Sequence, residues 1–234
     1  MLNIYAKCRV IEVRHDRYYY KVMKFGGKSK IVYLIWAILA LEFVLSMFNA
    51  RFALAFIALS ALLLSLAPEI FADRFHIRLP VHFFAGIVLF IFGTIYLGEA
   101  FDFYEKYWWW DVLLHGGSAI GFGLIGFVFV FILFEGDRYA APHWALSFIA
   151  FCIALSIGVI WEVFEFSMDQ IFGLNMQKSG LVDTMGDLIV DMLGAAMGAA
   201  SGFGFLKGRN SKGLPGIISE FVVKNRHFFK RRKR

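Results

Sequence analysis

Long apolar segments make up most of this chain, and short polar or Pro- and Gly-containing segments separate them. A helix needs about 20 predominantly apolar residues to cross a bilayer, because the hydrocarbon core is about 30 Å thick and each residue adds about 1.5 Å. The expected ranges of such helices are 31–48, 52–68, 80–98, 110–134, 143–166 and 184–206. The sequence therefore predicts an all-α fold, a polytopic six-helix transmembrane bundle that forms one domain.

Two prolines, Pro68 and Pro80, bound the connection expected between the second and third helices. Proline lacks the N–H group that the interior of a helix uses, but its fixed φ suits the first turn. We therefore expect the second helix to end at Pro68 and the third helix to begin at Pro80.

The composition also indicates a membrane protein. The chain is 59% hydrophobic and 18% charged, whereas a typical soluble domain is about half apolar and about a quarter charged. The two cysteines, Cys8 and Cys152, lie in a basic segment and in an apolar helix, so we expect no disulfide. The first apolar segment is long enough to be retained as an anchor, so we expect no cleavable signal peptide.

Basic residues are distributed unevenly among the segments outside these helices. If the N-terminus is cytoplasmic, all but three of the 24 Lys and Arg residues lie on the cytoplasmic side. The exceptions are Arg51, Lys106 and Lys178. Because cytoplasmic segments carry an excess of Lys and Arg, this distribution predicts that both termini are cytoplasmic. We expect the protein in a prokaryotic plasma (inner) membrane, as a multi-pass protein.

Both ends of the chain are basic tails, at residues 1–30 and 207–234. The N-terminal tail contains the aromatic run Tyr18–Tyr20, which would also suit a nucleic-acid patch. We interpret it instead as a cytoplasmic tail that contacts anionic lipid headgroups, with no nucleic-acid partner. The C-terminal tail can form a basic amphipathic helix from Pro215 onward. Its charges would contact anionic lipid, each contributing ~1 kcal/mol near the surface, or an acidic face of another protein.

Acidic residues concentrate on the opposite, outer side of the predicted bundle. They have little influence on topology, so this clustering needs its own explanation. Glu42, in the outer half of the first helix, is one candidate for a buried carboxylate. The others that lie deep enough to be buried are Glu162, Glu165, Asp187 and Asp191. The complete outer set in the later part of the chain is Glu99, Asp102, Glu105, Asp111, Glu162, Glu165, Asp169, Asp183, Asp187 and Asp191.

The sixth helix starts with three aspartates spaced by four residues, Asp183, Asp187 and Asp191. Four residues turn an α-helix by about 400°, so these carboxylates form one stripe. Gly194 and Gly198 continue the same face, and small residues let a neighbouring helix approach closely in a membrane. This face is therefore expected to be acidic at its outer end and closely packed below.

The fourth and fifth helices place similar groups at the same depth. Asp111 and His115 are four residues apart at the start of the fourth helix. Glu162 and Glu165 are three residues apart near the end of the fifth helix. Because the fourth and sixth helices run inward and the fifth runs outward, we expect all these groups to meet near the outer surface.

A divalent metal ion would explain why these carboxylates lie together beside hydrocarbon. A buried charge is costly unless it is paired, protonated or bound to a cation, and helical bundles build metal sites from carboxylate and histidine ligands on facing helices. Such ligands suit Mg²⁺, Mn²⁺, Ca²⁺, Fe²⁺ or Zn²⁺. Glu165, left without a metal bond, is the candidate general base. The predicted metal ligands are Asp111, His115, Glu162, Asp187 and Asp191.

The same residues also have simpler interpretations. They can lie in water at the mouth of the bundle, or make hydrogen bonds between helices. Asp111 and Asp183 can act as N-caps of the fourth and sixth helices, because Asp is preferred at that position and its charge favours the positive end of the helix dipole.

Several short motifs occur in a defined order along the chain. They are Pro68-Glu-Ile, Leu79-Pro80, Gly98-Glu99, Phe103-Tyr104, Trp110-Asp111-Val-Leu-Leu-His115, Trp161-Glu162-Val-Phe-Glu165 and Asp183-Thr-Met-Gly-Asp187-Leu-Ile-Val-Asp191. In this combination the chain resembles the YjdF-type bacterial inner-membrane proteins over about residues 30–206. The last helix is also similar to that of the VanZ-like membrane proteins, in which an Asp-rich start precedes small residues. The resemblance implies the architecture and the acidic positions, and it implies no reaction.

These features favour a metal-dependent membrane hydrolase or transferase that acts on a lipid-linked phosphate or ester at the outer leaflet. A di-iron redox site is an open variant. The alternative is a non-catalytic accessory or scaffold subunit of a larger membrane complex, in which the acidic cluster is structural or holds a stabilising ion. Ion or proton translocation is disfavoured, because the inner halves of the helices lack a continuing line of ionisable groups.

Overall fold

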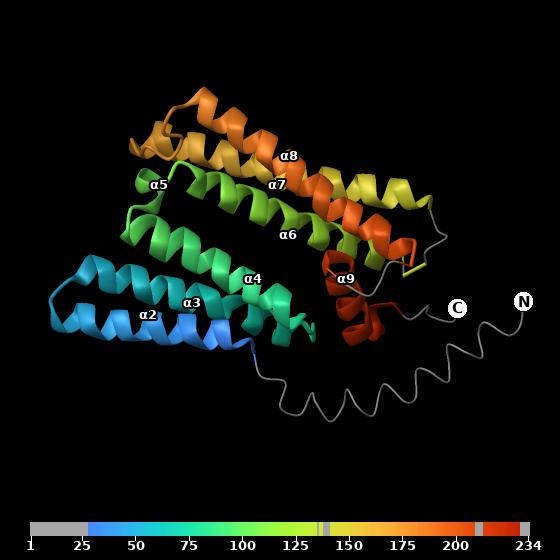
Figure 1. Ribbon diagram of the computed structural model, residues 1–234, viewed down its shortest axis with the longest axis horizontal. Helices are drawn as coiled ribbons and strands as arrows, with labels where there is room; N and C mark the ends of the chain where they lie inside the picture. The colour runs from blue at the N-terminus through green and yellow to red at the C-terminus, as the bar shows by residue number, and fades with distance from the viewer. Residues whose placement is uncertain (1–27, 135, 138–140, 209–212, 230–234) are drawn as a thin grey trace, which may run out of the picture.

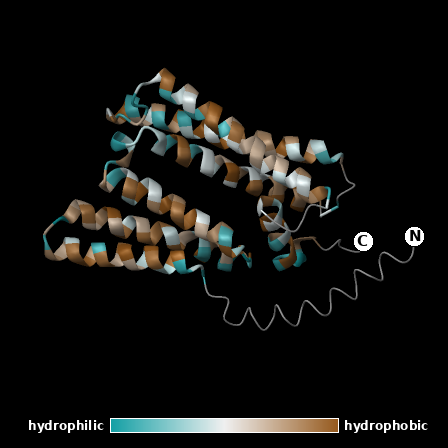
Figure 2. Ribbon diagram, viewed as in Figure 1, coloured by the Kyte–Doolittle hydropathy of each residue, from teal (hydrophilic) through white to brown (hydrophobic). Residues whose placement is uncertain are grey.

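The computed structural model describes residues 28–134, 136–137, 141–208 and 213–229. In these ranges all regular structure is helical, and six helical segments are long and apolar enough to cross a membrane. They are α2 (Lys30–Phe48), α3 (Phe52–Arg74), α4 with its continuation η1 (Val81–Ile91 and Phe92–Ala100), α6 (Trp109–Leu133), α7 (His143–Phe172) and α8 (Leu181–Leu206). The predicted all-α, six-helix fold is confirmed. Hydrophobic residues cover the lengths of these helices, and hydrophilic residues gather at their ends and connections (Figure 2).

Shorter elements complete the described part of the chain. They are α5 (Phe103–Lys106), α9 (Gly213–Lys224) and the 3₁₀ helix η2 (Arg226–Phe229). Most of the predicted N-terminal tail (residues 1–27) and the terminal basic run (230–234) lie outside the described residues. The predicted contacts of these tails with lipid therefore stay predictions.

Two of the predicted helix ends were wrong. Pro68 lies inside α3, which continues to Arg74. A proline removes only one helical N–H donor, and its φ is itself helical, so an apolar segment that continues beyond it can remain a helix. Helix α7 extends to Phe172, beyond the predicted end at residue 166, and stops at Gly173, whose φ of +66° is left-handed. The predicted start at Pro80 is confirmed, because Pro80 directly precedes α4.

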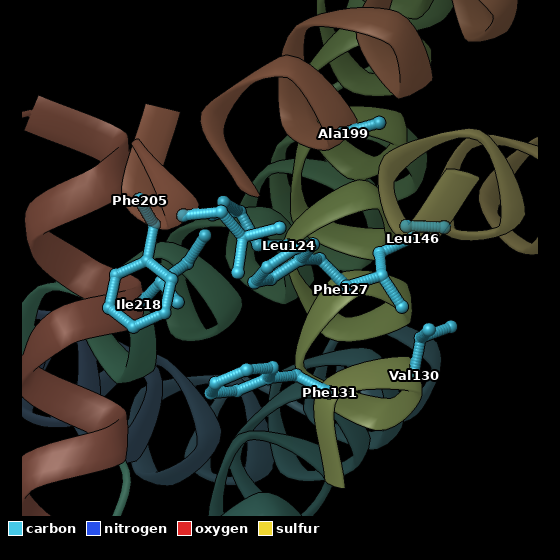
Figure 3. Packing of buried hydrophobic residues seen from close by; sticks show 10 residues of the cluster. Leu124, Phe127, Val130, Phe131, Leu146, Ala199, Phe205 and Ile218 are labelled. Carbon is cyan, nitrogen blue, oxygen red and sulfur yellow. The ribbon is translucent and has the colours of Figure 1, made fainter. Parts of the chain in front are cut away.

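The helices form two groups of three (Figure 1). Helices α6, α7 and α8 pack together in one group, and α2, α3 and α4–η1 form the other. Each group has its own buried core, centred on Phe127 and Leu146 in the first and on Leu39 and Val88 in the second. Figure 3 shows the first core, in which aromatic and aliphatic side chains from α6, α7, α8 and α9 meet.

The two ends of the molecule differ in what they carry. The end that contains α5 and the connections α2–α3 and α7–α8 is called the acidic end here. The opposite end carries α9 and the connections α3–α4 and α6–α7, and is called the α9 end (Figure 1).

Glycines allow α6 and α8 to pack with their backbones in contact. A Cβ atom added to Gly198 would lie 2.6 Å from the carbonyl oxygen of Ile120, and one added to Gly123 would lie 2.8 Å from the Cα of Gly198. Helix association in lipid depends on such close van der Waals packing. This geometry agrees with the prediction for the glycine face of the last helix. That face was expected to make a close helix contact directly below the carboxylates.

The two groups of helices are joined at both ends. At the acidic end, the indole Nε1 of Trp110 on α6 donates a hydrogen bond of 3.3 Å to the carbonyl oxygen of Gly93 in η1, a π-helical segment. At the α9 end, Asn225 follows α9 and contacts the backbone of Arg78 in the α3–α4 connection. The predicted amphipathic helix in the C-terminal segment forms as α9, and its Ile218 belongs to the core of the first group.

Candidate metal site

Three potential metal ligands converge at the acidic end of α6 and α8. Asp111 and His115 lie one turn apart on α6, and Asp187 faces them from α8. One ligand atom from each of the three lies within 4.8 Å of the others. His115 and Asp187 are buried, and Asp111 is half-buried. These three residues are the part of the predicted ligand set that the fold brings to a common point.

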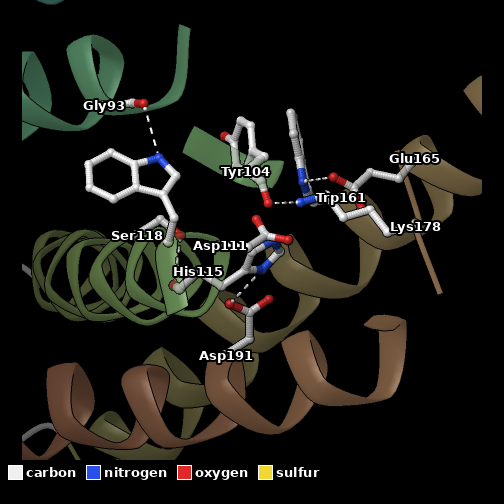
Figure 4. A network of polar contacts seen from close by, with 10 residues as sticks. Gly93, Tyr104, Asp111, His115, Ser118, Trp161, Glu165, Lys178 and Asp191 are labelled. Atoms are coloured by element: carbon white, nitrogen blue, oxygen red, sulfur yellow. Dashed lines mark hydrogen bonds and ion pairs between the residues drawn. The ribbon is translucent and has the colours of Figure 1, made fainter. Parts of the chain in front are cut away.

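His115 lies between two carboxylates, one on each side of its ring (Figure 4). Its Nδ1 is 3.3 Å from Oδ1 of Asp191, and its Nε2 is 3.8 Å from Oδ1 of Asp111. An imidazole that donates from one nitrogen presents the lone pair of the other. The contact with Asp191 therefore leaves Nε2 directed at the side where Asp111 lies.

Glu162 on α7 is the most unusual carboxylate of the cluster. It is 4% exposed, and neither of its carboxylate oxygens makes a hydrogen bond of good geometry among the described residues, although the Thr184 hydroxyl on α8 lies close by. Oδ2 of the buried Asp187 also lacks a partner in this part of the chain. Buried polar atoms are normally hydrogen-bonded, and a buried carboxylate without a partner is costly. Glu162 is close enough to His115 for their charges to interact, although it is outside the three-residue group.

Glu165, the predicted general base, lies one turn further along α7. Its Oε1 accepts a hydrogen bond of 2.9 Å from the indole Nε1 of Trp161, and the glutamate is half-buried (Figure 4). Its charge interacts with those of Glu162, His115 and Asp111. Glu165 therefore belongs to the cluster, beside Trp161. Among the described residues its hydrogen bond is to Trp161, and no hydrogen bond or ion pair joins it to the three convergent ligands.

Asp111 and Asp183 lie in the first turns of α6 and α8 but do not cap these helices. Neither Asp111 nor Asp183 is an N-cap, because α6 and α8 begin after Trp108 and Gly180 and neither helix start has a side-chain cap. The capping interpretation of both residues was wrong.

Glu42 does not join the cluster, because it lies in the other group of helices. Its Oε1 accepts a hydrogen bond of 2.9 Å from the hydroxyl of Ser46, and its Oε2 accepts one of 3.2 Å from the hydroxyl of Tyr96 in η1. Asp169 is also occupied, since its two carboxylate oxygens accept the backbone N–H groups of Met176 and Gln177. Asp169 thereby fixes the connection between α7 and α8.

Lys178 and Tyr104 cover the acidic end and were not singled out as site residues from the sequence. The Lys178 Nζ donates a hydrogen bond of 2.7 Å to the carbonyl oxygen of Tyr104 and lies 5.0 Å from the centre of its ring. Burial raises the pKa of the Tyr104 phenol, and the negative charge of Asp111 raises this pKa further. The sequence did contain a signal for Lys178, because it is one of the three basic residues predicted on the outer side of the bundle, where the acidic residues concentrate.

The fold and the site together define the class of this protein. It is a multi-pass membrane protein with a buried carboxylate–histidine cluster. Comparison with known families agrees: the chain belongs to the family DUF2238, described as "Predicted membrane protein", which matches residues 31–208. A Thermotoga maritima protein named "Uncharacterized protein" is 31% identical over 128 residues, which are 55% of this chain. The aligned region spans 65% of that relative, slightly under two thirds of its length. No solved structure matches the chain.

These comparisons confirm the membrane-protein class that the sequence predicted. The finer resemblances, to YjdF-type and VanZ-like proteins, are not named by them and stay predictions.

Proposed function

We propose that this protein binds a divalent cation among α6, α7 and α8 and uses it to hydrolyse or transfer a lipid-linked phosphate or ester. The observation that carries the proposal is a set of three buried carboxylate oxygens without hydrogen-bond partners among the described residues: both oxygens of Glu162 and Oδ2 of Asp187. Asp187 is one of the three convergent ligands, and Glu162 is close enough to His115 for their charges to interact. A bound cation would satisfy these oxygens and offset the repulsion among the carboxylates.

The ligand set favours a hard or borderline metal. Asp111, His115 and Asp187 supply two carboxylates and one imidazole, and Glu162 is the proposed fourth ligand. Oxygen ligands with one nitrogen suit Mg²⁺, Mn²⁺, Fe²⁺, Zn²⁺ or Ca²⁺. Cys152, the cysteine within the described residues, is exposed and lies several turns before Glu162 on α7, so it contributes no thiolate to the proposed site.

The proposed chemistry divides the roles among neighbouring side chains. The cation would polarise a phosphoryl or carbonyl oxygen and acidify a bound water. Glu165 would accept the proton of that water, because it is close to the cluster and no hydrogen bond or ion pair among the described residues ties it to the three convergent ligands. Trp161 would hold the Glu165 carboxylate in place through its hydrogen bond of 2.9 Å.

The distribution of charge supports a particular orientation. The basic residues favour cytoplasmic termini in a prokaryotic plasma membrane, which would place the acidic end at the outer leaflet. In this orientation the basic tails would contact anionic headgroups. A reporter that is active only in the periplasm should be silent when it is fused after Arg234, and activity of that fusion would reverse the orientation.

The catalytic step can be tested with the full chain in nanodiscs. Phosphate release or ester hydrolysis from lipid-linked substrates should require added Mn²⁺ or Mg²⁺ and should stop with EDTA. Glu165→Gln should reduce the rate by about 10²–10⁴-fold, the range for loss of a general base, while the protein keeps its metal. Equal rates for wild type and Glu165→Gln would refute the assignment of the base, and no metal-dependent turnover would refute the enzymatic function.

A non-catalytic accessory subunit with a stabilising ion is the second candidate. The contact of Lys178 with the Tyr104 carbonyl favours it, because this contact ties α5 to the α7–α8 connection and so suits a structural role for the acidic end. In that case removing the metal should lower the unfolding temperature of the protein, and lipid-linked substrates should show no turnover.

A further inference from the structure

We infer that Asp191 is a positioning residue, whose carboxylate fixes the His115 ring through Nδ1, and that Gly158 on α7 provides the space for this carboxylate. The inference rests on the proposed function in one respect, that Nε2 of His115 binds a metal. The contact between Asp191 and Nδ1 of His115 does not depend on metal. It replaces the prediction that Asp191 is itself a metal ligand.

The placement of Asp191 separates it from the convergent ligands. It lies one turn beyond Asp187 on α8, is 2% exposed, and contacts His115 at 3.3 Å on Nδ1. The nitrogen on the other side of the ring, Nε2, is the one that lies near Asp111. A carboxylate that accepts a hydrogen bond from one ring nitrogen of a histidine fixes both the tautomer and the ring orientation. The other ring nitrogen is then presented to a metal.

Gly158 explains why the Asp191 carboxylate has one position. A Cβ atom added to Gly158 would overlap Oδ2 of Asp191 and would lie 3.0 Å from its Cγ and 3.2 Å from its Cβ. The aspartate is short and buried, so we expect a Cβ at this position to push its carboxylate away from His115. Three helices thus meet at one contact: α6 supplies the imidazole, α8 supplies the carboxylate, and α7 supplies a residue without a side chain.

Two variants test this arrangement from different helices. Asp191→Asn removes the charge that holds Nδ1, and Gly158→Ala displaces the same carboxylate without changing any ligand. Gly117→Ala is the matched control, because a Cβ at Gly117 on α6 has no heavy atom within 4 Å. Each variant is used as the full chain in nanodiscs, and only variants with a cooperative unfolding transition are compared.

The first readout is Mn²⁺ affinity, measured by electron paramagnetic resonance, with the nitrogen coupling of the bound Mn²⁺ recorded on the same samples. Asp191→Asn and Gly158→Ala should weaken binding by about 10–100-fold, the usual effect of losing an outer carboxylate partner, at unchanged stoichiometry. Both should also alter the nitrogen coupling, and Gly117→Ala should change neither. Complete loss of binding in Asp191→Asn, equal to that in Asp187→Asn, would instead make Asp191 a ligand and overturn the inference.

The second readout needs no metal and separates this inference from the proposed function. In ¹⁵N-histidine-labelled protein the His115 signals, assigned by their loss in His115→Gln, should show Nδ1 as the protonated nitrogen. Asp191→Asn and Gly158→Ala should both shift these signals, and Gly117→Ala should not. Unchanged His115 signals in both variants would overturn the positioning role even if the wild type binds metal. The expected shifts in a protein that binds no Mn²⁺ would uphold the contact and refute only the proposed function.

Discussion

Replacing Asn225 with leucine should weaken the connection between the two groups of helices at the α9 end and so destabilise the protein. Asn225 is fully buried, at 0% exposure, in the turn between α9 and η2. Its Oδ1 accepts the Arg78 N–H at 2.7 Å, and its Nδ2 donates at 2.8 Å to the carbonyl oxygens of Arg78 and Phe221. Two of these three hydrogen bonds join residues that are 147 positions apart in the chain.

The structure sets the expected magnitude. Leucine has the same number and branching of side-chain heavy atoms as asparagine but no polar group, so the substitution removes these hydrogen bonds and leaves the Arg78 backbone groups without these partners. At about 1 kcal/mol of net stability per hydrogen bond, Asn225→Leu should lower the free energy of unfolding by about 3 kcal/mol. The loss is larger if the Arg78 groups stay buried, because an unsatisfied backbone group adds its own desolvation cost.

Reversible unfolding in mixed detergent micelles, followed by circular dichroism, measures this change. Asn49→Ala is the control, because Asn49 is exposed and its side chain makes one hydrogen bond of 2.8 Å to the Leu45 carbonyl. Its effect should stay within about 0.5 kcal/mol. If Asn225→Leu costs no more than Asn49→Ala, the contact with Arg78 does not hold the two groups together, and the reasoning is wrong.

Two further predictions concern helix packing and the second group of helices. Gly198→Ala should destabilise the protein by about 1–3 kcal/mol through overpacking against α6, whereas Gly186→Ala, which meets nothing within 4 Å, should be neutral or stabilising by up to about 1 kcal/mol. Tyr96→Phe should cost about 1 kcal/mol, because it removes the donor to Glu42, while Tyr33→Phe on an exposed face should cost less than 0.5 kcal/mol. Thermal unfolding in detergent checks both pairs, and equal effects within a pair would contradict them.

Hydropathy and helical spacing predicted most of the fold and the main part of the cluster. The apolar segments gave the six helices, because membrane helices must satisfy their backbone groups internally. The spacing of four between Asp111 and His115 put both on one side of α6, as the structure shows. The prediction that α6 and α8 bring carboxylates and the histidine to one depth agrees with the convergence on Asp187.

Features that depend on packing between helices could not be predicted in this way. The spacing along α8 does not distinguish Asp187 from Asp191. The rotation of α8 against α6 places Asp187 in the ligand group and Asp191 beside Nδ1 of His115. The depth of Glu42 resembled that of the cluster, but its partner Tyr96 comes from a different helix, 54 residues away. Pro68 alone predicted the end of α3, but the helix continues past it to Arg74 because apolar residues follow the proline.

The central claim is that Asp111, His115 and Asp187 hold a divalent cation, and metal content measures it most directly. Full-length protein purified in detergent, loaded with Mn²⁺ and desalted, should retain stoichiometric metal by elemental analysis. Asp111→Asn/Asp187→Asn should retain almost none, whereas Asp102→Asn, which changes an exposed carboxylate at the same end, should match the wild type. Substoichiometric metal in the wild type, unchanged in Asp111→Asn/Asp187→Asn, would contradict the account.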